Sequence, residues 1–138
     1  MADEESVDRH LAAVIDQVIS AIQATKQAVW SASTPEKRAA LTDLKGFLGE
    51  QLVVLSEAEE RINGRAPSIT SPTGRAIRNL RSEADNDFSA FKALVLNELR
   101  GVAADARARA VEISGASEAE LLTGLADGLD QRVDSLGA

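Results

Sequence analysis

The sequence predicts an all-α protein, folded as an antiparallel four-helix bundle. Apolar residues recur at steps of three and four along most of the chain, which places them on one side of an α-helix. Aromatic residues make up only 3% of the sequence, so the core has to be built from Leu, Val, Ile and Ala, as in closely packed helices. Three links interrupt the apolar pattern and divide the chain into four helices. We expect residues 1–138 to form a single domain.

The first two helices are predicted over residues 6–31 and 35–63. Either Ser33 or Thr34 can cap the second helix through its hydroxyl group, and Pro35 suits a first helical turn. Because the link is short, these helices are expected to form an antiparallel hairpin. Val53 and Val54 widen the apolar face of the second helix beyond one stripe, so neighbours in the bundle or a second subunit should cover it on two sides.

The third helix is predicted over residues 72–113, after an irregular link that could cross the bundle. Unbroken, it would be roughly 60 Å long at about 1.5 Å per residue, against about 40 Å for each of the first two helices. Residues 82–87, SEADND, offer several side chains that cap helices. We therefore expect the long third helix to kink or break there.

The fourth helix is predicted over residues 118–136. Gly115 can end the preceding helix, and Ser117 and Glu120 have the spacing of a capping box, in which each side chain binds the free N–H of the other residue. Gly124 and Gly128 lie one turn apart and allow another backbone to approach closely.

The composition and net charge of the chain exclude several classes of function. A formal net charge of −7 argues against generic binding to nucleic acid or to an anionic membrane, and no apolar run approaches the roughly 20 residues of a membrane span. The chain has no cysteine, which excludes disulfides and thiolate metal sites. No secretory signal is visible, so we expect a soluble cytoplasmic protein without a cofactor.

Acidic residues are the candidate metal ligands, in particular Glu50, Glu57 and Glu98. Glu50 and Glu57 are seven positions apart and share a helix face, although such spacing more often marks a solvated strip. A carboxylate-bridged metal pair in a bundle normally needs Glu-x-x-His, and the only histidine, His10, has Val7 three positions before it. The sequence therefore predicts no metal site of that composition.

Arginines are the candidate anion ligands. Arg75, Arg78 and Arg81 recur at three-residue spacing near the start of the predicted third helix, whose free N–H groups attract anions. The alternative is that these arginines pair with nearby Glu and Asp on exposed helix faces.

Residues 34–81 resemble a stretch of bacterial ferritin-like proteins of poorly defined function. The similarity lies in the turn Asn63-Gly64-Arg65-Ala66-Pro67, which follows a helix, and in the linker Ser71-Pro72-Thr73-Gly74, which leads into the next. The resemblance implies a ferritin-like bundle and, in many relatives, a metal centre. Because the Glu-x-x-His ligands are absent here, the metal function is not carried over.

The sequence contains no Gly-rich phosphate-binding loop. With a single histidine it also offers no Ser-His-Asp set and no helical zinc pair. We therefore expect a non-enzymatic protein that acts through protein–protein contacts, as a homodimer. The broad apolar faces at residues 52–55 and 94–96 favour the dimer. The alternative is a ferritin-like carrier of a metal or small ligand, which requires Glu50, Glu57 and Glu98 to converge in the core.

Overall fold

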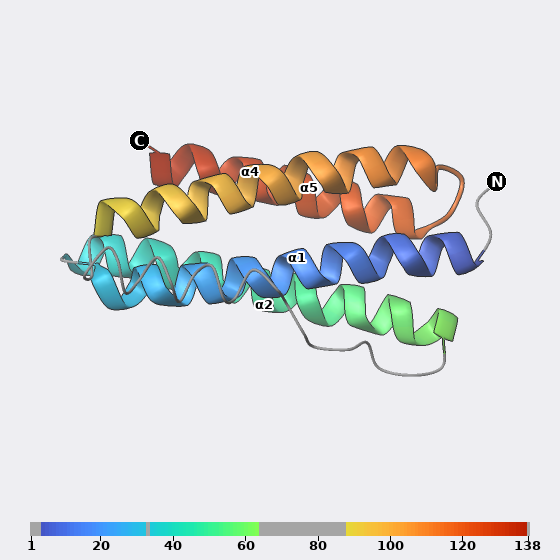
Figure 1. Ribbon diagram of the computed structural model, residues 1–138, viewed down its shortest axis with the longest axis horizontal. Coiled ribbons are helices and arrows are strands. Elements are labelled where there is room, and N and C mark those ends of the chain that lie inside the picture. The colour runs from blue at the N-terminus through green and yellow to red at the C-terminus, as the bar shows by residue number, and fades with distance from the viewer. Residues whose placement is uncertain (1–3, 33, 64–87, 138) are drawn as a thin grey trace.

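The computed structural model describes residues 4–32, 34–63 and 88–137, and this part of the chain is helical (Figure 1). It contains the helices α1 (Glu4–Ser31), α2 (Pro35–Asn63), α4 (Phe88–Glu112) and α5 (Glu118–Gly137). No strand occurs in the described residues, which confirms the all-helical prediction there. No described helix combines the length and the apolar composition that a membrane span needs.

The helix ends lie close to the predicted ones. α2 covers the predicted range, α1 begins at Glu4 instead of Ser6, and α5 ends at Gly137 instead of Leu136. The third predicted helix corresponds to α4, which ends at Glu112. Its first part, residues 72–87, and with it the expected kink lie outside the described residues.

A side-chain hydrogen bond at the start of α2 and a glycine after α4 explain where these two helices begin and end. Oγ1 of Thr34 accepts a hydrogen bond from the N–H of Lys37 at 3.2 Å, so Thr34 caps α2 as predicted. After α4, Gly115 has a φ of 99°, a left-handed conformation that suits glycine and ends the helix as expected.

The capping box predicted at the start of α5 is not formed. The Ser117 hydroxyl donates to Oε2 of Glu118 at 3.3 Å, and the N–H of Glu120 donates to the backbone carbonyl of Ser117 at 3.3 Å. Because the carbonyl of Ser117 already satisfies this N–H, its hydroxyl is not needed there.

The helices form two layers, with α1 and α2 in one and α4 and α5 in the other (Figure 1). α1 packs against both α2 and α4, and α5 packs mainly against α4. The contact between α2 and α5 is the smallest of these helix pairs. The three-residue link after α1 and the short turn after α4 therefore each join two helices that lie side by side.

The buried hydrophobic residues in the described part of the chain are all aliphatic, as the composition predicted, and Ser20, Thr25 and Glu59 are buried as well. All four helices contribute to the core, and its largest fully buried side chains are Leu11, Ile15, Leu41, Leu44, Leu48, Leu55, Leu99, Ile113, Leu122 and Leu125. These leucines and isoleucines set the rotation of each helix, and so decide which polar residues face water.

Candidate functional site

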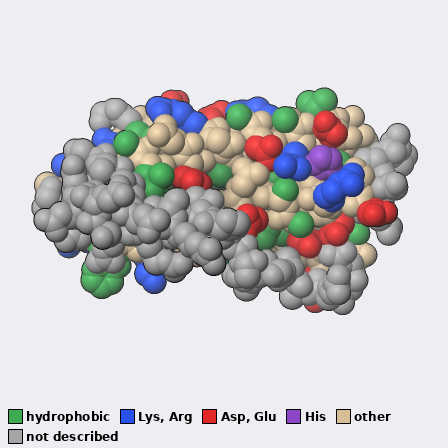
Figure 2. Space-filling model, viewed as in Figure 1, with side chains coloured by type: hydrophobic (Ala, Val, Ile, Leu, Met, Phe, Trp, Pro, Cys, Tyr) green, Lys and Arg blue, Asp and Glu red, His purple; other side chains and the backbone are tan. Residues whose placement is uncertain are grey.

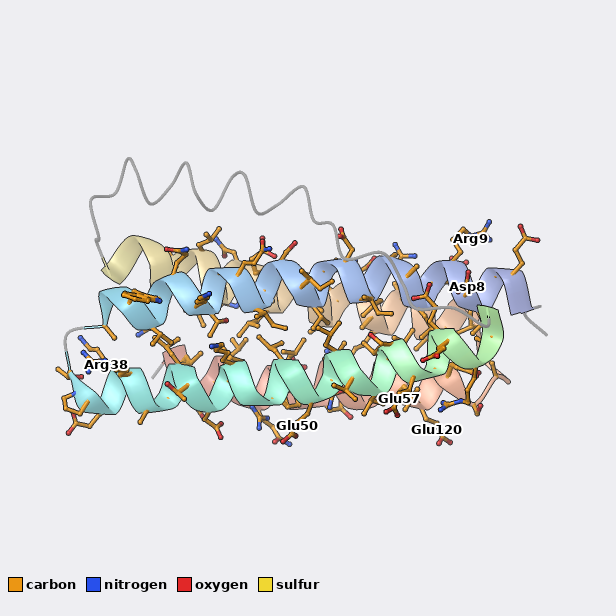
Figure 3. The ribbon with its side chains drawn as sticks, turned by 90° about the horizontal axis from the view of Figure 1, so that it is seen from below. Asp8, Arg9, Arg38, Glu50, Glu57 and Glu120 are labelled. Carbon is orange, nitrogen blue, oxygen red and sulfur yellow. The ribbon has the colours of Figure 1, made fainter. Side chains whose placement is uncertain are left out.

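The three glutamates considered as metal ligands do not come together. Glu50 and Glu57 are exposed on α2 (Figure 3), whereas Glu98 is half-buried on α4. No group of three His, Asp or Glu side chains in residues 4–32, 34–63 and 88–137 could hold a metal ion. The convergence that a carboxylate carrier requires is therefore absent from the described part of the chain.

Glu98 lies in a shallow depression on the surface where α1 and α4 meet. Gln17 and Asp105 line the same depression, together with Asn97, Gly101 and Val102. Burial raises the pKa of the Glu98 carboxyl above its ordinary value of 4.5, because a half-buried carboxylate loses hydration. A carboxyl with a raised folded-state pKa contributes stability below its unfolded pKa and loses that contribution as the pH rises through the folded pKa.

Replacing Glu98 by glutamine should therefore stabilise the protein at neutral pH. We expect Glu98→Gln to raise the melting temperature at pH 7 by a few degrees at most. The gain should shrink as the pH falls through the raised pKa of Glu98 and be absent below pH 4.5. Glu57→Gln is the matched control, since it removes the same charge from an exposed position of α2. Equal gains in both variants at pH 7 would assign the effect to net charge and contradict the role of burial.

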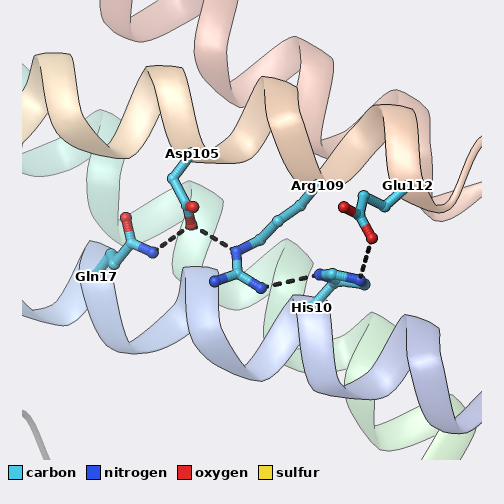
Figure 4. A network of polar contacts seen from close by, with 5 residues as sticks. All are labelled: His10, Gln17, Asp105, Arg109 and Glu112. Atoms are coloured by element: carbon cyan, nitrogen blue, oxygen red, sulfur yellow. Dashed lines mark hydrogen bonds and ion pairs between the residues drawn. The ribbon is translucent and has the colours of Figure 1, made fainter.

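A network of polar side chains joins α1 to α4 (Figure 4). Oδ2 of Asp105 accepts hydrogen bonds from Nε2 of Gln17 and from Nε of Arg109, each at 2.5 Å. Nη1 of Arg109 lies 2.9 Å from Nδ1 of His10, and Nε2 of His10 lies 3.8 Å from Oε2 of Glu112. The histidine reaches the surface among charged side chains (Figure 2).

This network links α1 to α4 through side-chain contacts, and we call it the clamp. A guanidinium group only donates hydrogen bonds, so Nδ1 of His10 accepts from Arg109 and the ring carries its proton on Nε2, toward Glu112. Burial acts to raise the pKa of Asp105, but the hydrogen bonds from Arg109 and Gln17 outweigh it and lower that pKa. The histidine is thus hydrogen-bonded to α4 through Nδ1, while Nε2 faces Glu112 at a distance too long for a hydrogen bond.

Sequence reasoning did not identify this clamp. Asp105 and Arg109 are four positions apart, a spacing that places them together on a helix and is visible in the sequence. His10 and Gln17 share a face of α1, but nothing in the sequence pairs that face with α4. The clamp therefore depends on how the two helices pack.

Exposed apolar side chains mark a different kind of surface. In the described part of the chain, the large hydrophobic residues that are exposed are Trp30, Val53, Val54 and Val111. Val53 and Val54, on α2, are 55% and 37% exposed. In the other predicted apolar face, at residues 94–96 of α4, Leu94 and Leu96 are half-buried and pack against the core. The apolar face at residues 52–55 of α2 is therefore the more exposed of the two.

Val111 lies in an open groove between α4 and α5, with a volume of about 680 Å³. Small residues line much of it, including Ala110, Ala119 and Gly124. Arg107 at its edge is paired within the chain, since its Nη2 lies 2.8 Å from Asp127 and 2.6 Å from Asp130. Val111 is 75% exposed, so a substitution there can serve as a control for substitutions of the exposed valines of α2.

Two earlier expectations remain open. Arg75, Arg78 and Arg81 lie outside the described residues, so the anion site stays a prediction.

Comparison with models of known protein families finds no match, and no curated protein matches the sequence. The resemblance to ferritin-like proteins therefore also stays a prediction.

Proposed function

We propose that this chain is a non-enzymatic helical-bundle protein that acts through protein–protein contacts, and that it forms a homodimer. The observation that carries the proposal is the pair of exposed valines on α2, Val53 and Val54. Fully burying an exposed valine side chain is favourable by about 1.5 kcal/mol or more, and a contact between two identical surfaces gains this twice.

The test is the mass of the protein in solution, measured by light scattering at tens of micromolar. We expect the unmodified chain to be a dimer and Val53→Arg to be a monomer, because an arginine would place two like charges in an apolar contact. Val111→Arg is the matched control, since it changes a valine on α4 that is even more exposed, 75% against 55% for Val53. It should leave the dimer intact.

The remaining outcomes are equally clear. A monomeric unmodified chain at this concentration would overturn the homodimer. A dimer that Val111→Arg dissociates and Val53→Arg does not would move the contact to the groove between α4 and α5. Circular dichroism of each variant would establish that the arginine has not simply unfolded the bundle.

We also propose that the bundle is antiparallel and of the ferritin-like kind. The support is the direction of the helices in Figure 1, where α1 and α2 run in opposite directions, α4 and α5 do likewise, and α2 and α4 run the same way. Ferritin-like bundles, whose topology includes one long crossover, have this arrangement. An experimental structure with α2 and α4 in opposite directions would contradict the proposal. A cytoplasmic location remains a prediction from the sequence.

A further inference from the structure

The outer surface of α2 has a regular pattern around Val53. Ala39, Gly46, Val53 and Glu60 lie seven positions apart, close to two helical turns, and all four are exposed. A Cβ atom added at Gly46 would meet nothing within 4 Å, so the space over this glycine is open. We call these four residues the outer α2 line. It combines a projecting valine with an open position two turns before it.

The charges along α2 differ between its two halves. Residues 35–47 carry three basic and two acidic residues, and one of the acidic residues, Asp43, already faces Nε of Arg132 at 3.8 Å. Residues 48–63 carry four acidic residues and one basic residue. The first half is therefore positive and the second half negative. Two copies of α2 attract each other when they run antiparallel, whereas parallel copies place their acidic halves together.

We propose that two copies of this chain pair through their outer α2 lines, with the helices antiparallel about a two-fold axis near Gly49 and Glu50. Val53 of each copy then lies over the open position at Gly46 of its partner, and Glu60 lies near the partner's Ala39. The inference rests on the proposed homodimer and adds the surface and the register. The same contact occurs twice, as a two-fold axis requires.

Cysteine cross-linking tests the register, because the chain contains no cysteine of its own. The variants Ala39→Cys and Glu60→Cys are prepared separately in the full chain, mixed, and treated with a short bis-maleimide. We expect the mixture to give cross-linked heterodimers. Each variant alone should give little product, because two copies of the same position are roughly 30 Å apart along an antiparallel pair at about 1.5 Å per residue.

Each other outcome is decisive. Efficient cross-linking of Glu60→Cys with itself would mean parallel helices and would overturn the inference. A dimer by light scattering that cross-links in neither experiment would place the contact elsewhere, which overturns the inference and leaves the homodimer standing. A monomer by light scattering would overturn both.

A second pair of variants tests the open position itself. Gly46→Gln should fill the space that Val53 of the partner occupies and weaken dimerisation about tenfold or more. Gly101→Gln is the control, because Gly101 on α4 is also exposed and also has nothing within 4 Å of an added Cβ atom. Both variants should fold, since glutamine favours a helix more than glycine does. An unchanged dimer dissociation constant in Gly46→Gln would overturn the register.

Discussion

Replacing Leu99 by alanine is expected to lower the free energy of unfolding by about 3 kcal/mol, the typical cost of a cavity left by a buried leucine. Leu99 is fully buried on α4, and its side chain belongs to the aliphatic core that α1, α2, α4 and α5 share. The buried hydrophobic residues of this core are leucines, valines, isoleucines and alanines. None of these is large enough to fill the space by a simple change of rotamer.

Urea denaturation at one fixed protein concentration measures the effect, because the stability of a dimer depends on concentration. Val111→Ala serves as the control on the same helix, since this valine is 75% exposed and alanine favours a helix. The control should leave the free energy of unfolding nearly unchanged. A loss of less than about 1 kcal/mol in Leu99→Ala would contradict a closely packed core.

The helices themselves could be predicted from the sequence because their signals are local. The apolar stripe of each helix lies within the helix, and the cap at Thr34 and the left-handed turn at Gly115 involve residues a few positions apart. The exposure of Glu50 and Glu57 also follows from the sequence, since the stripe that includes Leu48 and Leu55 turns the other side of α2 outward.

The packing between helices could not be predicted in the same way. The wide apolar faces of α2 and α4 look alike in the sequence, yet Leu94 and Leu96 pack against the core while Val53 and Val54 stay exposed. Which face is covered depends on the position of the neighbouring helices. The pairing of His10 with Arg109 has the same origin, because the two residues are 99 positions apart.

Gly124 and Gly128 of α5 look alike in the sequence, but their surroundings in the structure differ. Gly124 lies beside open space, where an added Cβ atom would meet nothing within 4 Å. At Gly128 the added atom would lie 2.4 Å from Cζ and 2.7 Å from Cε1 of the Phe47 ring. The sequence predicted the approach of another backbone at both glycines, but at Gly128 the nearest atoms belong to a side chain of α2.

We therefore expect opposite results from the same substitution one turn apart. Gly124→Ala should raise the free energy of unfolding by about 1 kcal/mol, the intrinsic preference of a helix for alanine over glycine. Gly128→Ala should lower it by about 1 kcal/mol, because the displacement of Phe47 outweighs that gain. The ring has little freedom to retreat, since the guanidinium of Arg132 lies over it at 3.8 Å from the centroid.

A double-mutant cycle identifies the cause. In a Phe47→Leu background the clash at Gly128 should be relieved, so Gly128→Ala should become less destabilising or even stabilising, whereas Gly124→Ala should give the same gain in both backgrounds. This matters for the fold because Phe47 and Arg132 lie at the smallest helix contact, between α2 and α5. If Gly128→Ala stabilises the unmodified protein as much as Gly124→Ala does, the ring moves freely and does not hold α2 against α5.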